Sequence, residues 1–502
     1  MANPFKNTKV LELLSEYKNI WALKYLSALA EWDMEVYMPH KGAESHGIAM
    51  GKLTTMVQKY FLDEKFTDLV KAVKEEKNLT DAEKGVIRIL SEELDKFSKF
   101  PAEFLEDFDS TVSLAHGAWI KAKQQNDYKS FEPHLEKIVE LVKRKAEYIG
   151  YTDHPYDALL GCYESGLKTK EVEEFFDSIR PFLKDLLSYI KKSPKFKLQH
   201  PMELEKINVK KAEKLNLKLL NYFRYDSEAL RLDTSSHPFS EAFVPTHARI
   251  TTRYTDHDIK STYTAVAHEF GHALYDLQSD PAIGYTPISG GDSLGLQESQ
   301  SRFWENFVTR SKVFGEIFYN QIIKCGKNLK NYSSDDLYEY VNNVAPSLIR
   351  VEADEVTYHY HIMIRFEIEK GLIEGTIKVK DLPKVWNQKY KEYLGVEPKT
   401  DSEGVLQDIH WSLGSIGYFP TYSTGTVLSA VWAELIEKEL GSLNDLISSK
   451  SGISKIKKWL GKNLHKYGNT YTFNDMVRKA SGENFNTRAW KKYLETKYKS
   501  IY

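Results

Sequence analysis

The sequence predicts a mainly α-helical protein with one small β element. Over most of the first 200 residues, apolar side chains recur at intervals of three and four, which is the spacing of one buried helix face. A single short stretch near residue 250 is instead rich in β-branched and aromatic residues. With 41% hydrophobic and 28% charged residues among 502, the chain is long and apolar enough to bury a large core.

Long helices are expected throughout the first 200 residues. A capping box formed by Thr80 and Glu83 begins one of them, and Gly150 ends another. Their expected ranges are 9–32, 80–100, 104–123, 135–150 and 169–192. We expect a single domain over residues 1–502, with a candidate junction between lobes near 191–200, where a lysine-rich run is read equally well as an exposed loop.

The β element is predicted at residues 248–254, where the apolar period is too short for a helix. Such a strand could form one edge of a cleft and pair with an extended peptide backbone. A glycine-rich loop is expected at 289–295, followed by a second amphipathic helix. From Ser334, a plausible N-cap, the chain is again mainly helical, interrupted by a loop-like stretch at 397–426.

Charge and cysteine content exclude several classes of protein. The net charge of -2 gives no electrostatic basis for binding nucleic acid or an acidic membrane. Cys162 and Cys325 are too few for a disulfide framework and are typical of buried thiols in a reducing compartment. The first residues lack an apolar signal-peptide core, and no stretch of about 18 apolar residues occurs. We therefore expect a cytoplasmic protein with neither nucleic acid nor membrane as partner.

The pattern His268-Glu269-Phe270-Gly271-His272 predicts a metal site on a helix. At about 100° per residue the two histidines share one face, with Glu269 about a quarter turn away. The opposite face is apolar and consists of Val266, Phe270, Ala273 and Leu277. A helix buried on that side can hold two imidazoles toward a metal and place Glu269 as a base for water. The alternative is a core helix that carries the pattern by chance.

Glu298 is the best candidate for a third ligand. It shares a polar helix face with Arg302 and Glu305, and it follows His272 by 26 residues (298 minus 272), a spacing typical of zinc sites with two histidines and one glutamate. Glu305 is a weaker candidate, and a surface glutamate is the other alternative. Three protein ligands leave one position for water, as in catalytic sites. Zn²⁺ and Co²⁺ both suit this ligand set.

Eight segments in order along the chain resemble the carboxypeptidase Taq family, peptidase family M32. They are W-D-M-E-V-Y-M-P from Trp32, H-P-Y-D-A-L-L from His154, H-P-F from His237, A-R-I-T-T-R-Y from Ala248, H-E-F-G-H from His268, E-S-Q-S-R-F-W-E-N from Glu298, I-R-V-E-A-D from Ile349 and G-V-L-Q-D-I-H-W from Gly404. The resemblance implies long helices forming a saddle-shaped molecule around a deep groove with the metal at its bottom, usually as a homodimer. It also implies removal of single residues from peptide carboxyl termini with broad preference.

The sequence departs from the family patterns at two positions. The family's H-E-S/G-Q appears with Gln297 in place of the histidine, which changes the surroundings of the ligands while keeping Glu298. The family's D-x-R-x-T appears with His247 in place of the aspartate, an imidazole instead of an anion beside Arg249. The second change could alter the pairing of Arg249 and the specificity of the groove.

Four residues are candidates for binding the substrate. Arg350 is the best candidate for the terminal carboxylate, because a guanidinium forms a two-pronged hydrogen bond with it and the resembling motif lies in the substrate groove. Its alternative is an ion pair with Asp354, one helical turn on. His410 and Tyr422 are candidate donors to the oxyanion, with structural hydrogen bonds as their alternative. Arg249 is the next candidate for the carboxylate.

These observations together predict a zinc- or cobalt-dependent carboxypeptidase that acts on peptides with a free carboxyl terminus. In this hypothesis Glu269 activates water and passes its proton to the leaving amine. The ligand set alone does not show which end of a peptide is cut, so a metalloendopeptidase or oligopeptidase is an alternative. A non-catalytic helical scaffold that binds peptides is another, which the intact Glu269 disfavours.

Overall fold

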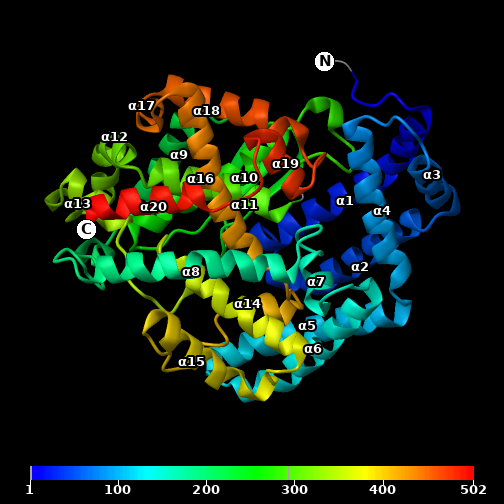
Figure 1. Ribbon diagram of the computed structural model, residues 1–502, viewed down its shortest axis with the longest axis horizontal. Helices are drawn as coiled ribbons and strands as arrows, with labels where there is room; N and C mark the ends of the chain where they lie inside the picture. The colour runs from blue at the N-terminus through cyan, green and yellow to red at the C-terminus, as the bar shows by residue number, and fades with distance from the viewer. Residues whose placement is uncertain (1–2, 292) are drawn as a thin grey trace. The chain divides into compact units, whose positions relative to one another are not determined.

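The computed structural model describes residues 3–291 and 293–502, and helices make up most of it (Figure 1). The chain divides into two compact units, each assembled from three segments that are distant in the sequence. Unit 1 takes residues 1–98, 201–341 and 429–485, and unit 2 takes 99–200, 342–428 and 486–502. One boundary therefore falls between His200 and Pro201.

Unit 1 contains a three-stranded sheet and most of the helices. Its elements are α1 (Thr8–Val36), α2 (Ala43–Phe61), α3 (Glu64–Lys74), α4 (Asp81–Lys99), α9 (Val209–Tyr222), β1 (Leu230–Thr234), β2 (Ser240–Val244), β3 (His247–Thr252), α10 (Ile259–Leu277), α11 (Leu294–Arg302), a π-helix (Phe303–Thr309), α12 (Lys312–Ile322), α13 (Ser334–Val341), most of α16 (Pro420–Leu440), α17 (Leu443–Ile447), α18 (Lys450–Asn463) and α19 (Phe473–Ser481). Its N-terminal part has a core of aromatic and branched side chains from α1, α3 and α4.

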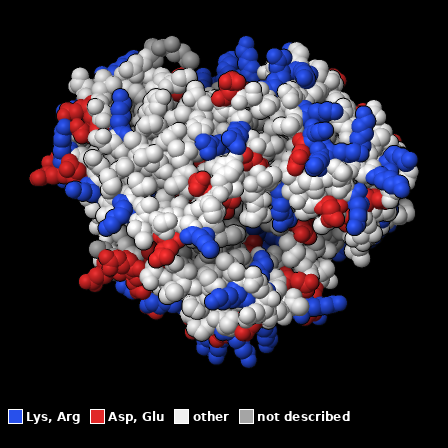
Figure 2. Space-filling view, turned by 180° about the vertical axis from the view of Figure 1, so that it is seen from behind, with Lys and Arg blue, Asp and Glu red and all other residues white. Residues whose placement is uncertain are grey.

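Unit 2 is helical throughout its described elements. They are α5 (Ala102–Gln125), α6 (Tyr128–Ile149), α7 (Pro155–Leu160), α8 (Thr169–Lys191), a 3-10 helix at Arg350–Glu352, α14 (Tyr358–Glu374), α15 (Leu382–Leu394), a 3-10 helix at His410–Leu413 and α20 (Arg488–Ile501). Within residues 3–291 and 293–502, every helix is too short or too polar to cross a membrane. The face drawn in Figure 2 carries both signs of charge with uncharged surface between them, in keeping with the small net charge.

The helices predicted from periodicity are present, with differences at their ends. The Thr80 and Glu83 capping box is confirmed, since each side chain bonds the backbone N–H of the other. The N-cap of α13 is Ser333 rather than Ser334, because Ser333 forms its own capping box with Asp336. The stretch predicted as a loop up to residue 426 ends earlier, where Pro420 begins α16.

The predicted strand is confirmed as β3, but the expectation that its backbone pairs with an extended peptide is wrong. The strand order is β1-β3-β2, with β1 parallel and β2 antiparallel to β3. The backbone of β3 is therefore paired on both sides, and β1 and β2 are the edges. The sequence missed these two because each is only five residues long and carries charged side chains that hide any apolar alternation.

Candidate metal centre

Helix α10 carries the His268, Glu269 and His272 pattern and is buried on nearly all sides. It begins at Asp258, whose left-handed backbone (φ 55°) and carboxylate cap the helix by accepting from the N–H of Ser261. The Tyr340 hydroxyl also donates to Asp258, at 2.6 Å. The apolar residues between and behind the histidines pack inside unit 1, so the backbone that carries the pattern is held rigidly.

Gly271 explains how the second helix comes close to the first. A Cβ at this position would lie 2.5 Å from the carbonyl oxygen of Gln300 and 2.6 Å from the Cα of Ser301. Only glycine allows the backbones of α10 and α11 to approach this closely. The glycine inside the motif therefore brings Glu298 over the two histidines.

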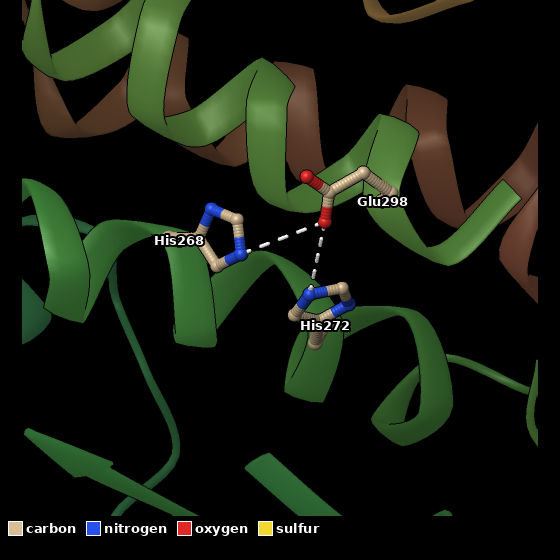
Figure 3. A group of neighbouring side chains, drawn as sticks. All are labelled: His268, His272 and Glu298. Carbon is tan, nitrogen blue, oxygen red and sulfur yellow. Dashed lines mark ion pairs between the residues drawn. The ribbon is translucent and has the colours of Figure 1, made fainter. Parts of the chain in front are cut away.

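Three donor atoms converge between α10 and α11 (Figure 3). The Oε2 of Glu298 lies 3.6 Å from the Nε2 of His268 and 3.6 Å from the Nε2 of His272. Its Oε1 accepts from the Nε of Arg302 at 2.6 Å, which orients the carboxylate. Among the described residues this is the one group of ligand-type side chains close enough together to hold a metal ion. Two imidazoles and one carboxylate fit a zinc-type ion.

The other ring nitrogen of each histidine is already engaged, which leaves the two Nε2 atoms for a metal. The Nδ1 of His268 lies 2.9 Å from Glu305 Oε2, and the Nδ1 of His272 lies 3.2 Å from Gln297 Oε1. Such partners fix the ring orientation of metal-binding histidines. Gln297, the first departure from the family pattern, thus lies beside a candidate ligand and contacts it.

Glu305 supports His268 from outside the group of converging atoms. It lies on the π-helix and accepts from Arg302 Nη1 at 3.1 Å and Arg310 Nη2 at 2.8 Å. Burial opposes its charge, but these arginines hold the pKa of Glu305 well below the usual range. The structure therefore places Glu298 among the three facing atoms and Glu305 behind His268.

The surroundings shift the pKa values of His268, His272 and Glu269 in different directions. Burial opposes charge on His268, but the carboxylates of Glu298 and Glu305 outweigh it and raise the pKa of His268. Burial, together with the charge of His268, lowers the pKa of His272 to about 4. Burial raises the pKa of Glu269 to about 7, against a hydrogen bond from the Ser240 side chain of β2. A buried carboxyl beside a cation-binding group is a candidate general base.

Arg249 lies on β3, in contact with the second departure from the family pattern. Its Nε donates to the Nε2 of His247 at 3.1 Å, so His247 acts as a neutral acceptor where the family has a carboxylate. Burial and the charge of Arg249 lower the pKa of His247, in keeping with that role. The guanidinium also lies over the rings of Trp32 and Phe243. Arg249 is thus paired with a neutral imidazole rather than with a carboxylate at position 247.

In unit 2, Arg350 forms an ion pair with Asp408 and not with Asp354. Its Nε and Nη2 both lie 3.0 Å from Asp408 Oδ1, and Arg365 holds Oδ2 through its Nε at 2.6 Å. Asp354 instead accepts from Val356 N–H, Thr357 N–H and the Thr357 hydroxyl. The predicted alternative pairing fails because residues 350–352 form a 3-10 helix, not an α-helix.

His410 and Tyr422 lie next to each other in the same unit. The Nε2 of His410 is 3.3 Å from the Tyr422 hydroxyl, and the ring of Tyr422 lies 5.0 Å from the guanidinium carbon of Arg350. Sequence reasoning missed two members of this cluster, Asp408 and Arg365. Asp408 stands inside the quoted G-V-L-Q-D-I-H-W segment, which is a signal for it, whereas Arg365 offers none.

A helical protein in which H-E-x-x-H and a glutamate from a second helix converge has the arrangement of a metallopeptidase. The sequence model described as "Carboxypeptidase Taq (M32) metallopeptidase" matches residues 12–498. The chain belongs to this family of metallocarboxypeptidases. Membership of the family does not favour the alternatives of an endopeptidase or a non-catalytic scaffold.

Similar proteins agree with this assignment. Thermostable carboxypeptidase 1 of Pyrococcus furiosus is 42% identical over 499 residues, 99% of this chain and 100% of the relative. Carboxypeptidase 1 of Bacillus subtilis is 35% identical over 477 residues, 95% of each chain. A solved Pyrococcus furiosus carboxypeptidase superposes with a TM-score of 0.96 at 42% identity, covering 98% of this chain and 99% of the other.

Proposed function

We propose that this protein is a zinc- or cobalt-dependent carboxypeptidase that removes single residues, with broad preference, from peptides with a free carboxyl terminus. The observation that carries the proposal is the convergence of His268 Nε2, His272 Nε2 and Glu298 Oε2 within reach of one ion, with Glu269 on the same helix. These three side chains would hold the metal. When bound, the metal supplies Lewis-acid polarisation of the scissile carbonyl and makes water more acidic.

Glu269 is the proton carrier in this proposal. Its carboxylate takes a proton from the attacking water and then gives it to the nitrogen of the leaving residue. The buried surroundings of Glu269 exclude bulk water, so the proton is not lost between the two steps. The hydrogen bond with the Ser240 side chain orients the carboxyl.

Arg350 is proposed to bind the terminal carboxylate of the substrate. Asp408 engages the Nε and Nη2 of Arg350, which fixes the guanidinium plane and leaves the edge that contains Nη1 for a second carboxylate. His410 and Tyr422, beside that guanidinium, are proposed as donors to the oxyanion. Arg249 is the second cation proposed to contact substrate.

The proposal also covers the domain organisation, the oligomeric state and the cellular compartment. We propose that both units act as one catalytic domain over residues 1–502 and that the enzyme is a cytoplasmic homodimer, on the strength of the family resemblance and of the two unpaired cysteines. Light scattering of the purified protein measures the oligomeric state.

The decisive experiment incubates an unblocked peptide with the protein, with and without a chelator, and identifies the products by mass. Stepwise loss of carboxyl-terminal residues, abolished by the chelator and restored by zinc or cobalt, is expected. Internal fragments would contradict the carboxypeptidase, and hydrolysis unaffected by the chelator would contradict the metal.

A further inference from the structure

We propose that Asp276 and the Gly290–Gly291 turn are positioning elements for His272, acting through the side-chain amide of Gln297. The inference rests on the proposed metal site. It adds residues that neither the H-E-x-x-H pattern nor the glutamate ligand contains, and it gives the departure at position 297 a chemical role.

The amide of Gln297 is held in one orientation by three acceptors. Its Nε2 lies 3.1 Å from each carboxylate oxygen of Asp276 and 3.2 Å from the carbonyl oxygen of Gly291. Rotating the amide by half a turn would place its oxygen against the carbonyl oxygen of Gly291, which has no hydrogen to give, and would turn its NH₂ group away from the Asp276 carboxyl. Asp276 and Gly291 therefore determine that Oε1 of Gln297 faces His272.

The orientation of that oxygen sets the proton position on His272. An amide oxygen only accepts, so the Nδ1 of His272, 3.2 Å away, must carry the hydrogen. The lone pair of the neutral ring is then on Nε2, the atom that faces Glu298 at 3.6 Å. This is the form of imidazole that binds a metal through Nε2.

The two glycines allow the turn to close on this arrangement. The N–H of Gly291 donates to Asp276 Oδ1 at 2.8 Å. A Cβ on Gly291 would lie 2.5 Å from the Tyr275 ring and 2.9 Å from Gln297 Nε2, and one on Gly290 (φ 77°) would lie 2.7 Å from Asp276 Oδ1. Part of the glycine-rich stretch predicted at 289–295 thus has a specific task, while Asp292 within it lies outside the described residues.

Glutamine preserves the direction of hydrogen bonding that a histidine would give at position 297. A neutral imidazole has one accepting nitrogen and one N–H, so it could also accept from His272 and donate to Asp276. Leucine, of similar size, can do neither. The relay is therefore expected to tolerate histidine and to fail with leucine.

The test measures zinc affinity by competition with a chromogenic chelator, together with the absorption spectrum of the cobalt-loaded protein. In Asp276→Asn, the new amide group directs N–H toward Gln297 and favours rotation of its amide, so zinc affinity should fall about 10–100-fold. Gln297→Leu should show a loss of the same order, and Gln297→His should stay close to the native affinity. Glu316→Gln, a change in an exposed carboxyl of α12, is the control and should bind zinc as the native protein does.

Thermal unfolding of the metal-free variants separates positioning from general stability. If Asp276→Asn does not fold, the comparison of Gln297→His with Gln297→Leu decides. Native zinc affinity in Asp276→Asn or Gln297→Leu, or equal losses in the two Gln297 variants, would overturn the inference. A native protein that binds no zinc at all would instead overturn the proposed function.

Discussion

Two buried, charged groups differ in their ratio of carboxylates to arginines. They are the metal group of unit 1, which consists of His268, His272 and Glu298, and the arginine cluster of unit 2, which consists of Arg350, Arg365 and Asp408. In unit 1 a carboxylate oxygen and two imidazole nitrogens face one another, and neighbouring carboxylates raise the pKa of His268. In unit 2 two guanidinium groups, Arg350 and Arg365, share the single carboxylate of Asp408. In unit 1, Glu298 and Glu305 also pair with Arg302 and Arg310, so carboxylates and guanidinium groups are equal in number there, whereas in unit 2 one carboxylate serves two guanidinium groups.

The two regions therefore differ in the net charge that their side chains leave. A buried charge is costly unless it is paired, so an unbalanced cluster is stable only if a ligand completes it or the surrounding fold holds it. Burial opposes charge on Asp408, yet Arg365 and Arg350 hold the pKa of that carboxyl well below its usual range. One carboxylate between two arginines leaves a net positive charge, which a substrate carboxylate would neutralise.

The largest effect is expected from removing a candidate metal ligand in unit 1. Glu298→Ala should lose stoichiometric metal and all metal-dependent hydrolysis, because it removes one of three ligands. Glu305→Gln should keep the metal with an affinity roughly 10–100-fold weaker, since it disturbs only the orientation of His268. Metal content and zinc affinity of the two purified proteins provide the measurement. Metal loss in Glu305→Gln with retention in Glu298→Ala would mean that the ligand and its supporting residue are interchanged.

The next effect separates chemistry from metal binding within unit 1. Glu269→Gln should bind metal as the native enzyme does but lose about 10²–10⁴-fold in kcat, the usual contribution of a general base. The amide is nearly isosteric and cannot accept the proton. Rates on one peptide, corrected for metal content, measure the loss. Native kcat in this variant would exclude Glu269 as the base.

The third prediction tests the anion-binding side. Arg350→Ala should lose roughly 2–5 kcal/mol of transition-state binding, or about thirtyfold to several thousandfold in kcat/KM, for a free-acid peptide. The amidated peptide, which lacks the charge, should change little. Arg350→Lys is the matched control, because it keeps the charge without the planar fork and should lie between. An unchanged preference for the free acid in Arg350→Ala would transfer the clamp to another cation, with Arg249 tested next.

Periodicity was sufficient to predict the helical fold and the pattern on α10, because one face of a long helix leaves a clear record in the sequence. On the second helix, periodicity put Glu298 and Glu305 on the same polar face, and the spacing from His272 together with the family motif favoured Glu298. Long-range partners were not predictable in this way. The pairing of Arg350 with Asp408 joins residues 58 apart, and nothing in the local pattern of either residue encodes it.

Short strands and the contacts that support the candidate ligands could not be predicted from the sequence either. The strands β1 and β2 are too short for their period to stand out, so β3 was expected to have a backbone free to pair with a peptide. Gln297 was recognised as a departure, but its contact with Asp276 depends on how a glycine turn closes over α10. Backbone approach of this kind is decided by tertiary packing rather than by local preference.

The smallest predicted effect is a loss of stability at low pH that is caused by His465 in unit 1. His465 is fully buried, with Nδ1 2.8 Å from the side-chain amide of Gln278 and Nε2 2.8 Å from that of Gln300. Because a neutral ring carries one hydrogen, one of these two amides presents its NH₂ group to the ring. Burial lowers the pKa of His465 to about 3. Above about pH 6.5 the ring is neutral in the folded and unfolded chains alike. Between pH 6.5 and 3 only the unfolded chain binds the proton, so the free energy of unfolding falls as the pH falls.

Two pH units of this difference amount to roughly 2–3 kcal/mol. Relative to His465→Gln, which cannot take up the proton, the native protein should therefore lose about that much stability between pH 6.5 and pH 4.5. The comparison is made by urea unfolding of metal-free samples, and the carboxyls whose pKa burial raises, such as Glu241, are common to both proteins and cancel. Asp408 should not contribute in this window, because its pKa is already below the ordinary value and it stays ionised in the folded chain. Hydrogen exchange resolved by peptide should accordingly show the difference between the two proteins in α10, α11 and the segment around His465, with unit 2 unchanged. If His465→Gln lost as much stability between pH 6.5 and pH 4.5, or if the exchange difference were confined to unit 2, protonation of His465 would not be the cause of the loss.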